Sequence, residues 1–218
     1  MKKVILSIFS LAFILQVSNA QNSSDMQSSS NGQSSFVFGL KGGANYSNQY
    51  DSKTSDFTSK SKLGFVGGAY IAIPLGQYFG IQPEVLFSQK GFTSSGKVLG
   101  SNYDLTRTTN YIDVPLLLTI KPISYLSIVA GPQYSYLIKQ KNVFSNNVFT
   151  TAQTNEFNNE NLRKNVLGFL GGVDINVKSL VIGLRAGWDI QNNNGDGTTT
   201  TPRYKNAWTQ ATVGFRLY

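Results

Sequence analysis

The sequence predicts an all-β fold, an eight-stranded antiparallel up-and-down transmembrane β-barrel, and three observations lead to this prediction. Apolar and polar residues alternate with a period of two from Phe36 onward, which is typical of strands with two different faces. The connections between these strands alternate between short and long. The composition combines 40% hydrophobic and 12% aromatic residues with 14% charged residues, against about 25% charged in a typical soluble domain.

Residues 1–20, "MKKVILSIFSLAFILQVSNA", are predicted to be a secretory signal peptide. Two lysines precede an apolar segment, and small residues at Ser18 and Ala20 predict cleavage after Ala20. A membrane anchor is the alternative, but the apolar stretch 4–17 is shorter than the roughly 20 residues that a membrane helix needs. The Ser-rich residues 21–35 are predicted to be a flexible lead-in, and residues 36–218 the barrel domain.

Eight segments carry the alternation, and each is roughly ten or more residues long, as a tilted membrane strand requires. They are residues 36–47, 63–74, 78–91, 109–121, 125–138, 165–177, 180–191 and 207–218.

The connections indicate a barrel of the outer-membrane type. Three are short, at 74–78, 121–125 and 177–180. The other four are long and polar, at 48–62, 92–108, 139–164 and 192–206. Outer-membrane barrels have short periplasmic turns and long outer loops, so we expect the outer membrane of a Gram-negative bacterium as the location. We also consider that residues 139–164 extend the neighbouring strands as a hairpin, whose edge could pair with a partner protein.

The two faces of each predicted strand differ in polarity. We assign the apolar face to lipid, because the interior of an eight-stranded barrel holds only a modest number of side chains. The polar face then points inward and carries charged residues. They are Lys41, Glu84, Lys90, Asp113, Lys121, Asp174, Arg185, Asp189 and Arg216.

These inward charges are expected to pair, because an isolated charge in a narrow, dry interior costs several kcal/mol. We expect Glu84 to interact with Arg185, and Arg216 to meet one of the inward carboxylates, at Glu84, Asp113, Asp174 or Asp189. One interpretation is a structural filling of salt bridges. The alternative is a polar path for a small solute or a proton.

A glycine pattern, G-x-x-[GA]-G, recurs in four of the predicted strands, at 39–43, 64–68, 168–172 and 183–187. Glycines on the inward face would free volume for the larger inward residue between them and ease the curvature of a small barrel. They lie within strands and no helix follows, so the pattern does not indicate a phosphate-binding loop.

The residue content argues against several function classes. The chain has no His and no Cys, which removes the usual base of acyl transfer and every thiolate metal site. We therefore expect no enzymatic activity, no cofactor and no metal. The basic excess is modest and not clustered, so we expect no nucleic-acid partner.

Basic residues gather near the bases of the long connections, where they are either ordinary solvated charges or contacts to lipid phosphates of the outer leaflet. These residues are Lys62, Arg107, Lys139, Lys141, Arg163, Lys164, Arg203 and Lys205. Outer-membrane lipid is thus one expected partner.

The final segment, "AWTQATVGFRLY", is predicted to pair with the first strand and close the barrel. Its aromatic residues Phe215 and Tyr218 form a candidate signal for the barrel-assembly machinery, which is a second expected partner.

Several segments resemble one known family. "GLKGGANYS", "GFVGGAYIAIPLGQYFGIQPEVLFSQKGF", "NYIDVPLLL", "AGPQYSYLI", "GGVDI" and "VGFRLY" are similar to the PorT-like, or porin-family, outer-membrane β-barrel proteins of Bacteroidota-type bacteria, over essentially all of residues 36–218. The resemblance implies an eight-stranded membrane barrel and assigns no particular activity.

The leading hypothesis is a non-enzymatic barrel with a largely filled polar interior, which acts in surface binding or envelope integrity through its long outer loops. Two alternatives stay open. One is a narrow porin-like channel for small solutes, and the other is an accessory barrel of a protein-secretion machine.

Overall fold

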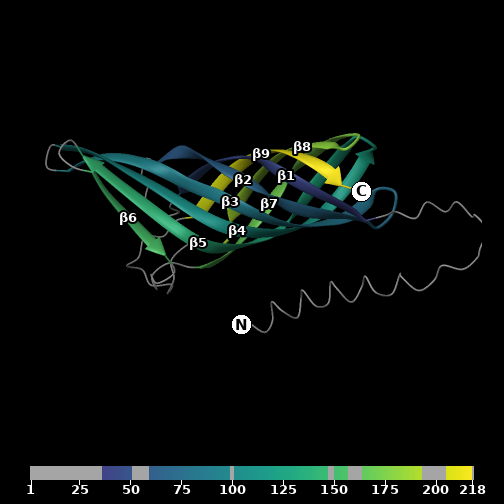
Figure 1. The fold of residues 1–218 in the computed structure, drawn as a ribbon, viewed down its shortest axis with the longest axis horizontal. Helices are drawn as coiled ribbons and strands as arrows, with labels where there is room; N and C mark the ends of the chain where they lie inside the picture. Colours follow the sequence, from purple (N-terminus) through teal and green to yellow (C-terminus); the bar gives the residue numbers. More distant parts are fainter. Residues whose placement is uncertain are drawn as a thin grey trace, which may run out of the picture. The chain divides into compact units, whose positions relative to one another are not determined.

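The computed structural model describes residues 36–50, 59–98, 101–146, 150–156, 164–192 and 205–217 (Figure 1). The predicted signal peptide, the predicted lead-in and Tyr218 lie outside these residues. The described part contains nine strands. They are β1 (Val37–Tyr50), β2 (Ser59–Pro74), β3 (Phe79–Val98), β4 (Ser101–Ile123), β5 (Leu126–Asn146), β6 (Thr150–Glu156), β7 (Asn165–Val177), β8 (Leu180–Asp189) and β9 (Lys205–Leu217).

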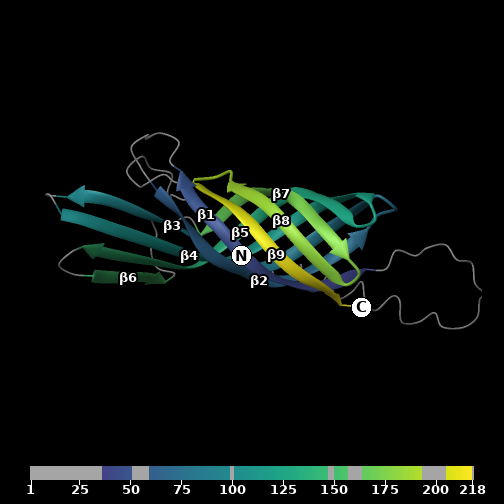
Figure 2. The ribbon, with the colours of Figure 1, turned by 90° about the horizontal axis from the view of Figure 1, so that it is seen from above.

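Eight of these strands form a closed antiparallel barrel, and β6 is an addition to it (Figure 2). The chain passes from β1 to β5 between neighbouring strands, continues through β7 and β8, and ends in β9. Strand β9 pairs with β1 from Phe38↔Leu217 to Tyr50↔Lys205, which removes both free edges of the barrel. The predicted eight-stranded up-and-down barrel is confirmed.

The three short connections also lie where the sequence predicts them. Residues 75–78 join β2 to β3, residues 124–125 join β4 to β5, and residues 178–179 join β7 to β8. Lys178 has a φ of 52°, in the left-handed region that a tight strand connection often uses. Each of the three turns follows a strand that runs in the same direction, because neighbouring strands of the barrel are antiparallel, so all three turns lie at the same end of the barrel.

The prediction of a loop at residues 92–108 is wrong. The β3–β4 pairing continues from Gly91↔Thr108 to Val98↔Ser101, so nearly all of this segment is strand. Alternation of apolar and polar residues marks a strand only where one face meets an apolar environment. In residues 92–98 and 101–108 apolar residues such as Phe92 and Leu105 share a face with polar and charged ones such as Ser94 and Arg107, so no clean alternation reveals the strands.

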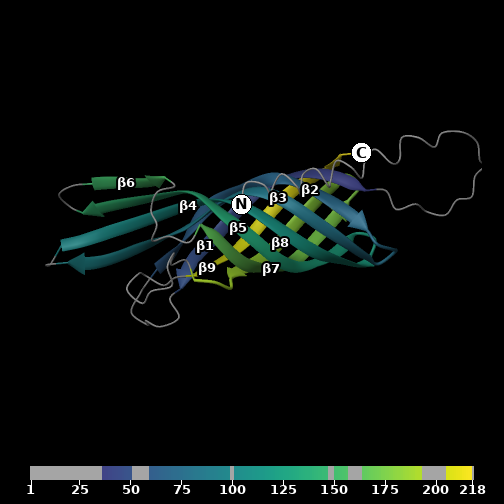
Figure 3. The ribbon, with the colours of Figure 1, turned by 90° about the horizontal axis from the view of Figure 1, so that it is seen from below.

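Strand β6 pairs with the outer part of β5, from Lys139↔Glu156 to Ser145↔Thr150. The hairpin considered for residues 139–164 thus forms, in the described residues, from 139–146 and 150–156. The outer parts of β3, β4, β5 and β6, at residues 92–98, 101–108, 139–146 and 150–156, project beyond the other strands (Figures 1 and 3). We call them the outer sheet. Among the described residues, no helix is long and apolar enough to cross a membrane.

The assignment of the two faces is confirmed. Apolar side chains of the barrel strands are largely exposed on its outside, for example Val85 at 54% and Leu184 at 57%. Polar and charged side chains of the opposite face are buried inside, for example Lys90 at 1% and Asp174 at 3%. This distribution is the inverse of a soluble protein and suits a barrel surrounded by lipid.

Candidate functional site

A central charge cluster lies inside the barrel and takes one residue from each of four strands. Lys41 comes from β1, Glu84 from β3, Asp174 from β7 and Arg185 from β8. Their side chains are between 0% and 5% exposed. The period-two geometry of each strand turns these residues inward, and closure of the barrel brings the four strands to the same interior.

Arg185 connects the two carboxylates of this cluster. Its Nη1 donates to Glu84 Oε1 and Oε2 at 2.9 and 3.0 Å. Its Nη2 and Nε donate to Asp174 Oδ2 and Oδ1 at 2.8 and 3.3 Å. Glu84 Oε1 also accepts from Lys41 Nζ at 2.6 Å and from Gln82 Nε2 at 2.8 Å. Two cations and two carboxylates therefore neutralise one another, which is what buried charges require.

A glycine makes room for this cluster. A Cβ at Gly183 would lie 2.7 Å from both Asp174 Oδ1 and Thr212 Oγ1, so these two side chains would have to move to admit it. The expectation that the repeated glycines free volume is confirmed here. The residues that use the space differ from the expectation. They are side chains of the adjacent strands, not the next inward residue of the same strand.

A second charged pair lies further toward the outer sheet. Lys90 Nζ is 3.0 Å from Asp113 Oδ2 and 3.7 Å from the ring centre of Trp208, a cation–π contact. Trp208 packs in a buried apolar layer with Leu117, Val129 and Leu170. This layer and the Lys90–Asp113 pair fill the interior beyond the central cluster.

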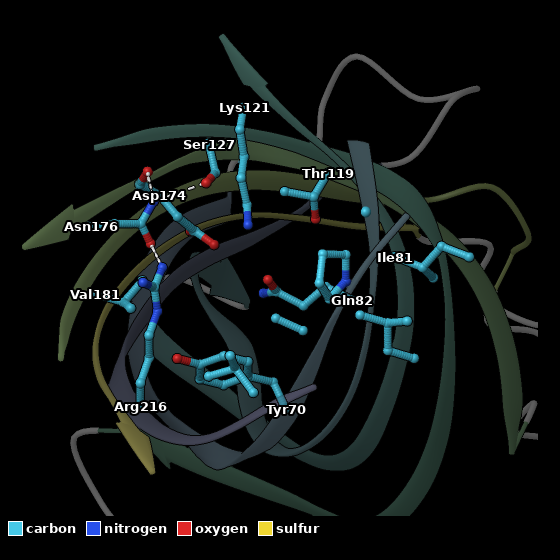
Figure 4. Close-up of a pocket in the computed structure, with 15 residues that line it drawn as sticks. Tyr70, Ile81, Gln82, Thr119, Lys121, Ser127, Asp174, Asn176, Val181 and Arg216 are labelled. Atoms are coloured by element: carbon cyan, nitrogen blue, oxygen red, sulfur yellow. Dashed lines mark hydrogen bonds between the residues drawn. The ribbon is translucent and has the colours of Figure 1, made fainter. Parts of the chain in front are cut away.

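The remaining three predicted inward charges lie apart from both groups. Asp189 Oδ2 accepts from the backbone N and from Nδ2 of Asn206, at 2.9 and 2.6 Å. Lys121 and Arg216 line a cavity at the end of the barrel that carries the short turns (Figure 4). The nine residues thus form several separate groups along the barrel.

The expected carboxylate partner of Arg216 is not found among the described residues. Arg216 Nη2 instead donates to Oδ1 of Asn176, on β7. The nearest inward carboxylate on that strand, Asp174, already accepts from Arg185 with both oxygens. Because both oxygens of Asp174 already accept from Arg185, the guanidinium of Arg216 donates to the side-chain amide oxygen of Asn176.

Several residues of these groups were not among the predicted site residues. They are Gln82, Asn176, Asn206 and Trp208. All four occupy inward positions of their strands, so the alternation places them inside. Selecting only charged residues leaves out Gln82, Asn176 and Trp208, whereas Asn206 falls in the predicted connection 192–206 and lies in β9. Phe215, one half of the candidate assembly signal, faces outward and is 56% exposed.

The chemistry of the central cluster is that of mutual neutralisation. Each carboxylate of the central cluster is held by a cation, and neither is left to act as a base toward a ligand. Across the residues that the structure describes, no group of three or more His, Cys, Asp or Glu is placed to hold a metal ion.

Comparison with known structures finds other membrane barrels. The attachment invasion locus protein Ail of Yersinia pestis, in complex with the heparin analogue sucrose octasulfate, is 15% identical, with a TM-score of 0.49 over 84% of this chain and 99% of that chain. Neisserial surface protein A is 12% identical, with a TM-score of 0.46 over 83% of this chain and 97% of that chain. OprG of Pseudomonas aeruginosa is 12% identical, with a TM-score of 0.39 over 84% and 96% of the two chains.

Comparison with sequences gives a family. No curated protein matches the chain. The family profile described as "Outer membrane protein beta-barrel domain" matches residues 19–193, which includes every barrel strand except β9. With the closed barrel and its outward apolar face, this match establishes that the chain belongs to the outer membrane protein beta-barrel domain family.

Proposed function

We propose that the protein is a non-enzymatic, non-conducting barrel that acts at the outer surface of the envelope. In this proposal the basic residues at its outer rim bind phosphate groups of outer-leaflet lipid, and the outer sheet above them is available to a partner. The observation that carries the proposal is the difference in charge between the interior of the barrel and its outer rim. The centre of its interior is occupied by mutually neutralised charges, whereas its outer rim carries a ring of basic side chains that are not buried.

The filled interior supports the non-conducting part. Arg185 and Glu84 bridge the barrel from β8 to β3 with side chains at most 1% exposed. Leu117, Val129 and Leu170 are each 0% exposed in the next layer. A solute that crossed the barrel would have to break the central cluster, which would leave buried charges without partners.

The outer rim supports the lipid-binding part. The basic residues lie near the level where the outer sheet leaves the barrel, on β2, β4, β5 and β9 and just before β7, and none of them is fully buried. In the described part of the chain they are Lys60, Lys62, Arg107, Lys139, Lys141, Lys164 and Lys205. Phosphate groups are strong acceptors for Lys and Arg, and their charge complements such a rim. Arg163 and Arg203, which the sequence adds to this set, lie outside the described residues.

The outer sheet supports the partner-binding part. Strand β6 is the last strand of the pairing order and contacts β5 on one side. An exposed strand edge offers backbone donors and acceptors to an additional strand. A partner protein that adds a strand to β6 is therefore the interaction that fits this geometry.

Planar-bilayer conductance tests the non-conducting part. The folded protein is expected to give no sustained open channel, whereas Glu84→Ala/Arg185→Ala, which empties the centre of the interior, should raise the frequency of openings. Sustained channels of the unmodified protein would favour the alternative of a narrow porin-like channel.

Unfolding in defined lipid tests the rim. The protein should be more stable in bilayers that contain phosphate-rich anionic lipid than in neutral ones. Replacement of Lys62, Arg107, Lys139, Lys141 and Lys164 by Gln should remove this difference. Lys178→Gln, at the opposite end of the barrel, is the matched control and should keep it. An equal lipid response of the rim variant and the parent protein would refute the lipid contact.

The narrower likeness to PorT-type proteins belongs to this proposal as well. It would place the barrel next to a protein-secretion machine, and cross-linking followed by mass spectrometry in the source bacterium tests it. Cross-links from the outer sheet to a surface protein favour surface binding. Cross-links from the short turns to secretion components favour the accessory role.

A further inference from the structure

A cavity occupies the end of the barrel that carries the short turns. Its volume is about 70 Å³, and its lining includes residues from the ends of β2, β4, β7 and β9 and from the beginnings of β1, β3, β5 and β8. A single water needs about 10–15 Å³ in this measure, so the space holds a few waters or one small polyatomic ion. In an outer-membrane barrel this end faces the periplasm.

The cavity carries uncompensated positive charge. Lys121 on β4 and Arg216 on β9 both line it, and Figure 4 shows the Lys121 ammonium pointing into the space. Asp174 is the one carboxylate of the lining, and Arg185 engages both of its oxygens. Since Lys41 and Arg185 already balance Glu84 and Asp174, the charges of Lys121 and Arg216 have no carboxylate left to them among the described lining residues.

Buried hydroxyl groups face the same space. Thr119 is 5% exposed, and its hydroxyl has no hydrogen-bond partner among the described residues. It points into the cavity near Lys121 (Figure 4). Tyr70 is 4% exposed, and its hydroxyl lies beside Arg216. Buried polar groups without partners carry a free-energy penalty, and one of the ordinary reasons for their presence is a ligand.

The remaining donors of Arg216 complete the arrangement. A guanidinium has five N–H donors, and Arg216 uses one nitrogen, Nη2, for its bond to Asn176. Asn176 is in turn held by Ser127, since its Nδ2 donates to Ser127 Oγ at 2.8 Å. The guanidinium is thus fixed at the wall of the cavity with donors to spare.

From these contacts we propose that the cavity is a binding site for one small oxyanion of the phosphate class. Lys121, Arg216 and the Thr119 hydroxyl are its donors. Phosphate is the class that fits, because charge-assisted bonds from Lys and Arg to its oxygens are short and strong and the anion also accepts from hydroxyl groups. The site is separate from the outer rim, so it does not depend on the function proposed above.

The experiment is a calorimetric titration of inorganic phosphate into the folded, full-length barrel in nanodiscs of neutral lipid. We expect saturable binding with one site per chain. Lys121→Gln and Arg216→Gln should each weaken it about tenfold or more, as the loss of a charged hydrogen bond does. Thr119→Val changes no charge and keeps the side-chain shape, and it should weaken binding about two- to tenfold.

Lys178→Gln is the matched control, because it removes one positive charge from the same end of the barrel outside the cavity. It should leave the affinity unchanged. Each variant is first checked for folding by its shift in gel mobility on boiling. If Arg216→Gln fails to fold, Lys121→Gln and Thr119→Val carry the test. Absence of saturable binding, or equal weakening by Lys178→Gln, would overturn the proposal.

A second arm identifies the source of the anion. The titration is repeated in nanodiscs that contain phosphatidylglycerol. A lower apparent affinity for inorganic phosphate there shows that a lipid headgroup competes for the cavity. An unchanged affinity shows that the site takes soluble phosphate in preference to lipid.

Discussion

At the scale of single residues, Arg185 determines whether the central cluster of the barrel is electrically balanced. It is the residue that contacts both carboxylates of that cluster, Glu84 and Asp174, which lie on different strands. Removing it would leave Asp174 without its cation and Glu84 with Lys41 alone. A buried carboxylate without a partner destabilises a protein more than the intact ion pair stabilises it.

We therefore predict that Arg185→Met and Glu84→Gln each lower the free energy of unfolding by about 3–5 kcal/mol. The double variant should lose less than the sum of the two by roughly 1 kcal/mol or more, because the contact between Glu84 and Arg185 is lost in each single variant and only once in the double variant. Urea unfolding in lipid vesicles measures all three variants.

Asp113→Asn provides the comparison, because Asp113 pairs with Lys90 in a different group. Its effect should add to that of Arg185→Met within about 0.5 kcal/mol. Strict additivity of the Glu84 and Arg185 variants would show that their contact contributes nothing to stability.

Residue-level prediction from the sequence succeeds for direction and only in part for pairing. The expected contact between Glu84 and Arg185 is confirmed, and the expected carboxylate partner of Arg216 is wrong. The alternation alone places Lys41, Glu84 and Arg185 on the inward face, because a strand has only two faces. Which inward residues meet depends on the stagger between strands, and the sequence pattern does not reveal that stagger. Arg216 is the example, since its partner Asn176 is uncharged and lies on a strand that is not its neighbour in the sheet.

At the scale of the strands, the glycine repeats contain two kinds of position. At some, a larger side chain would clash with its neighbours, and at others there is room for one. A Cβ at Gly187 on β8 would lie 2.5 Å from the Trp208 ring and 3.0 Å from Leu170 Cδ1. Trp208 has little room to withdraw, because it packs in the buried layer under the Lys90 ammonium. At Gly171 on β7 the nearest atom to such a Cβ is 3.7 Å away, an ordinary contact.

Gly187→Ala should therefore destabilise the barrel by about 1–3 kcal/mol, the range for overpacking a filled interior. Gly171→Ala, in the same repeated pattern, should be neutral or stabilising by up to about 1 kcal/mol, because Ala restricts the unfolded chain. The two variants are compared by unfolding midpoint and by tryptophan fluorescence. Equal effects at both positions would mean that the repeat acts through strand flexibility and not through interior space.

The strands also show where sequence reasoning stops at the element scale. The turns after β2, β4 and β7 are predicted because polar or turn-forming residues interrupt two apolar alternations. The outer ends of β3 and β4 are missed because their pairing, up to Val98↔Ser101, mixes apolar and polar residues on one face and shows no clean alternation. Outside the lipid, backbone hydrogen bonds hold strands that the side-chain pattern no longer marks.

At the scale of the whole molecule, the barrel depends on the joining of its first and last strands. Removal of residues 216–218 deletes the first two pairs of the β1–β9 register, Phe38↔Leu217 and Gly39↔Arg216, and removes the Arg216 contact to Asn176. We predict that this deletion blocks assembly into the membrane. The check is the boiled and unboiled gel mobility of membrane fractions, with Lys178→Gln as a variant that should assemble normally. Normal assembly of the truncated chain would refute a role for the C-terminal residues.

The seam itself can be tested by a designed cross-link, since the chain has no Cys of its own. Tyr46 on β1 faces Thr209 on β9 in the observed register, and both side chains point outward. Partners in an antiparallel pair have Cα atoms about 4.5–5.5 Å apart, within the range of a disulfide. Tyr46→Cys/Thr209→Cys should therefore oxidise to an intramolecular disulfide that slows unfolding by holding β1 to β9.

The control moves one cysteine along the same outward face. Val213 pairs with Gly42, four positions from Tyr46, so a cysteine there lies about 13 Å away along the strand and out of reach. Tyr46→Cys/Val213→Cys should stay reduced under the same conditions, as thiol labelling and non-reducing gels would show. Cross-linking of Tyr46→Cys/Val213→Cys but not of Tyr46→Cys/Thr209→Cys would mean that β1 and β9 pair in a different register. Such a register would also separate Arg216 from Asn176 and Lys41 from the central cluster.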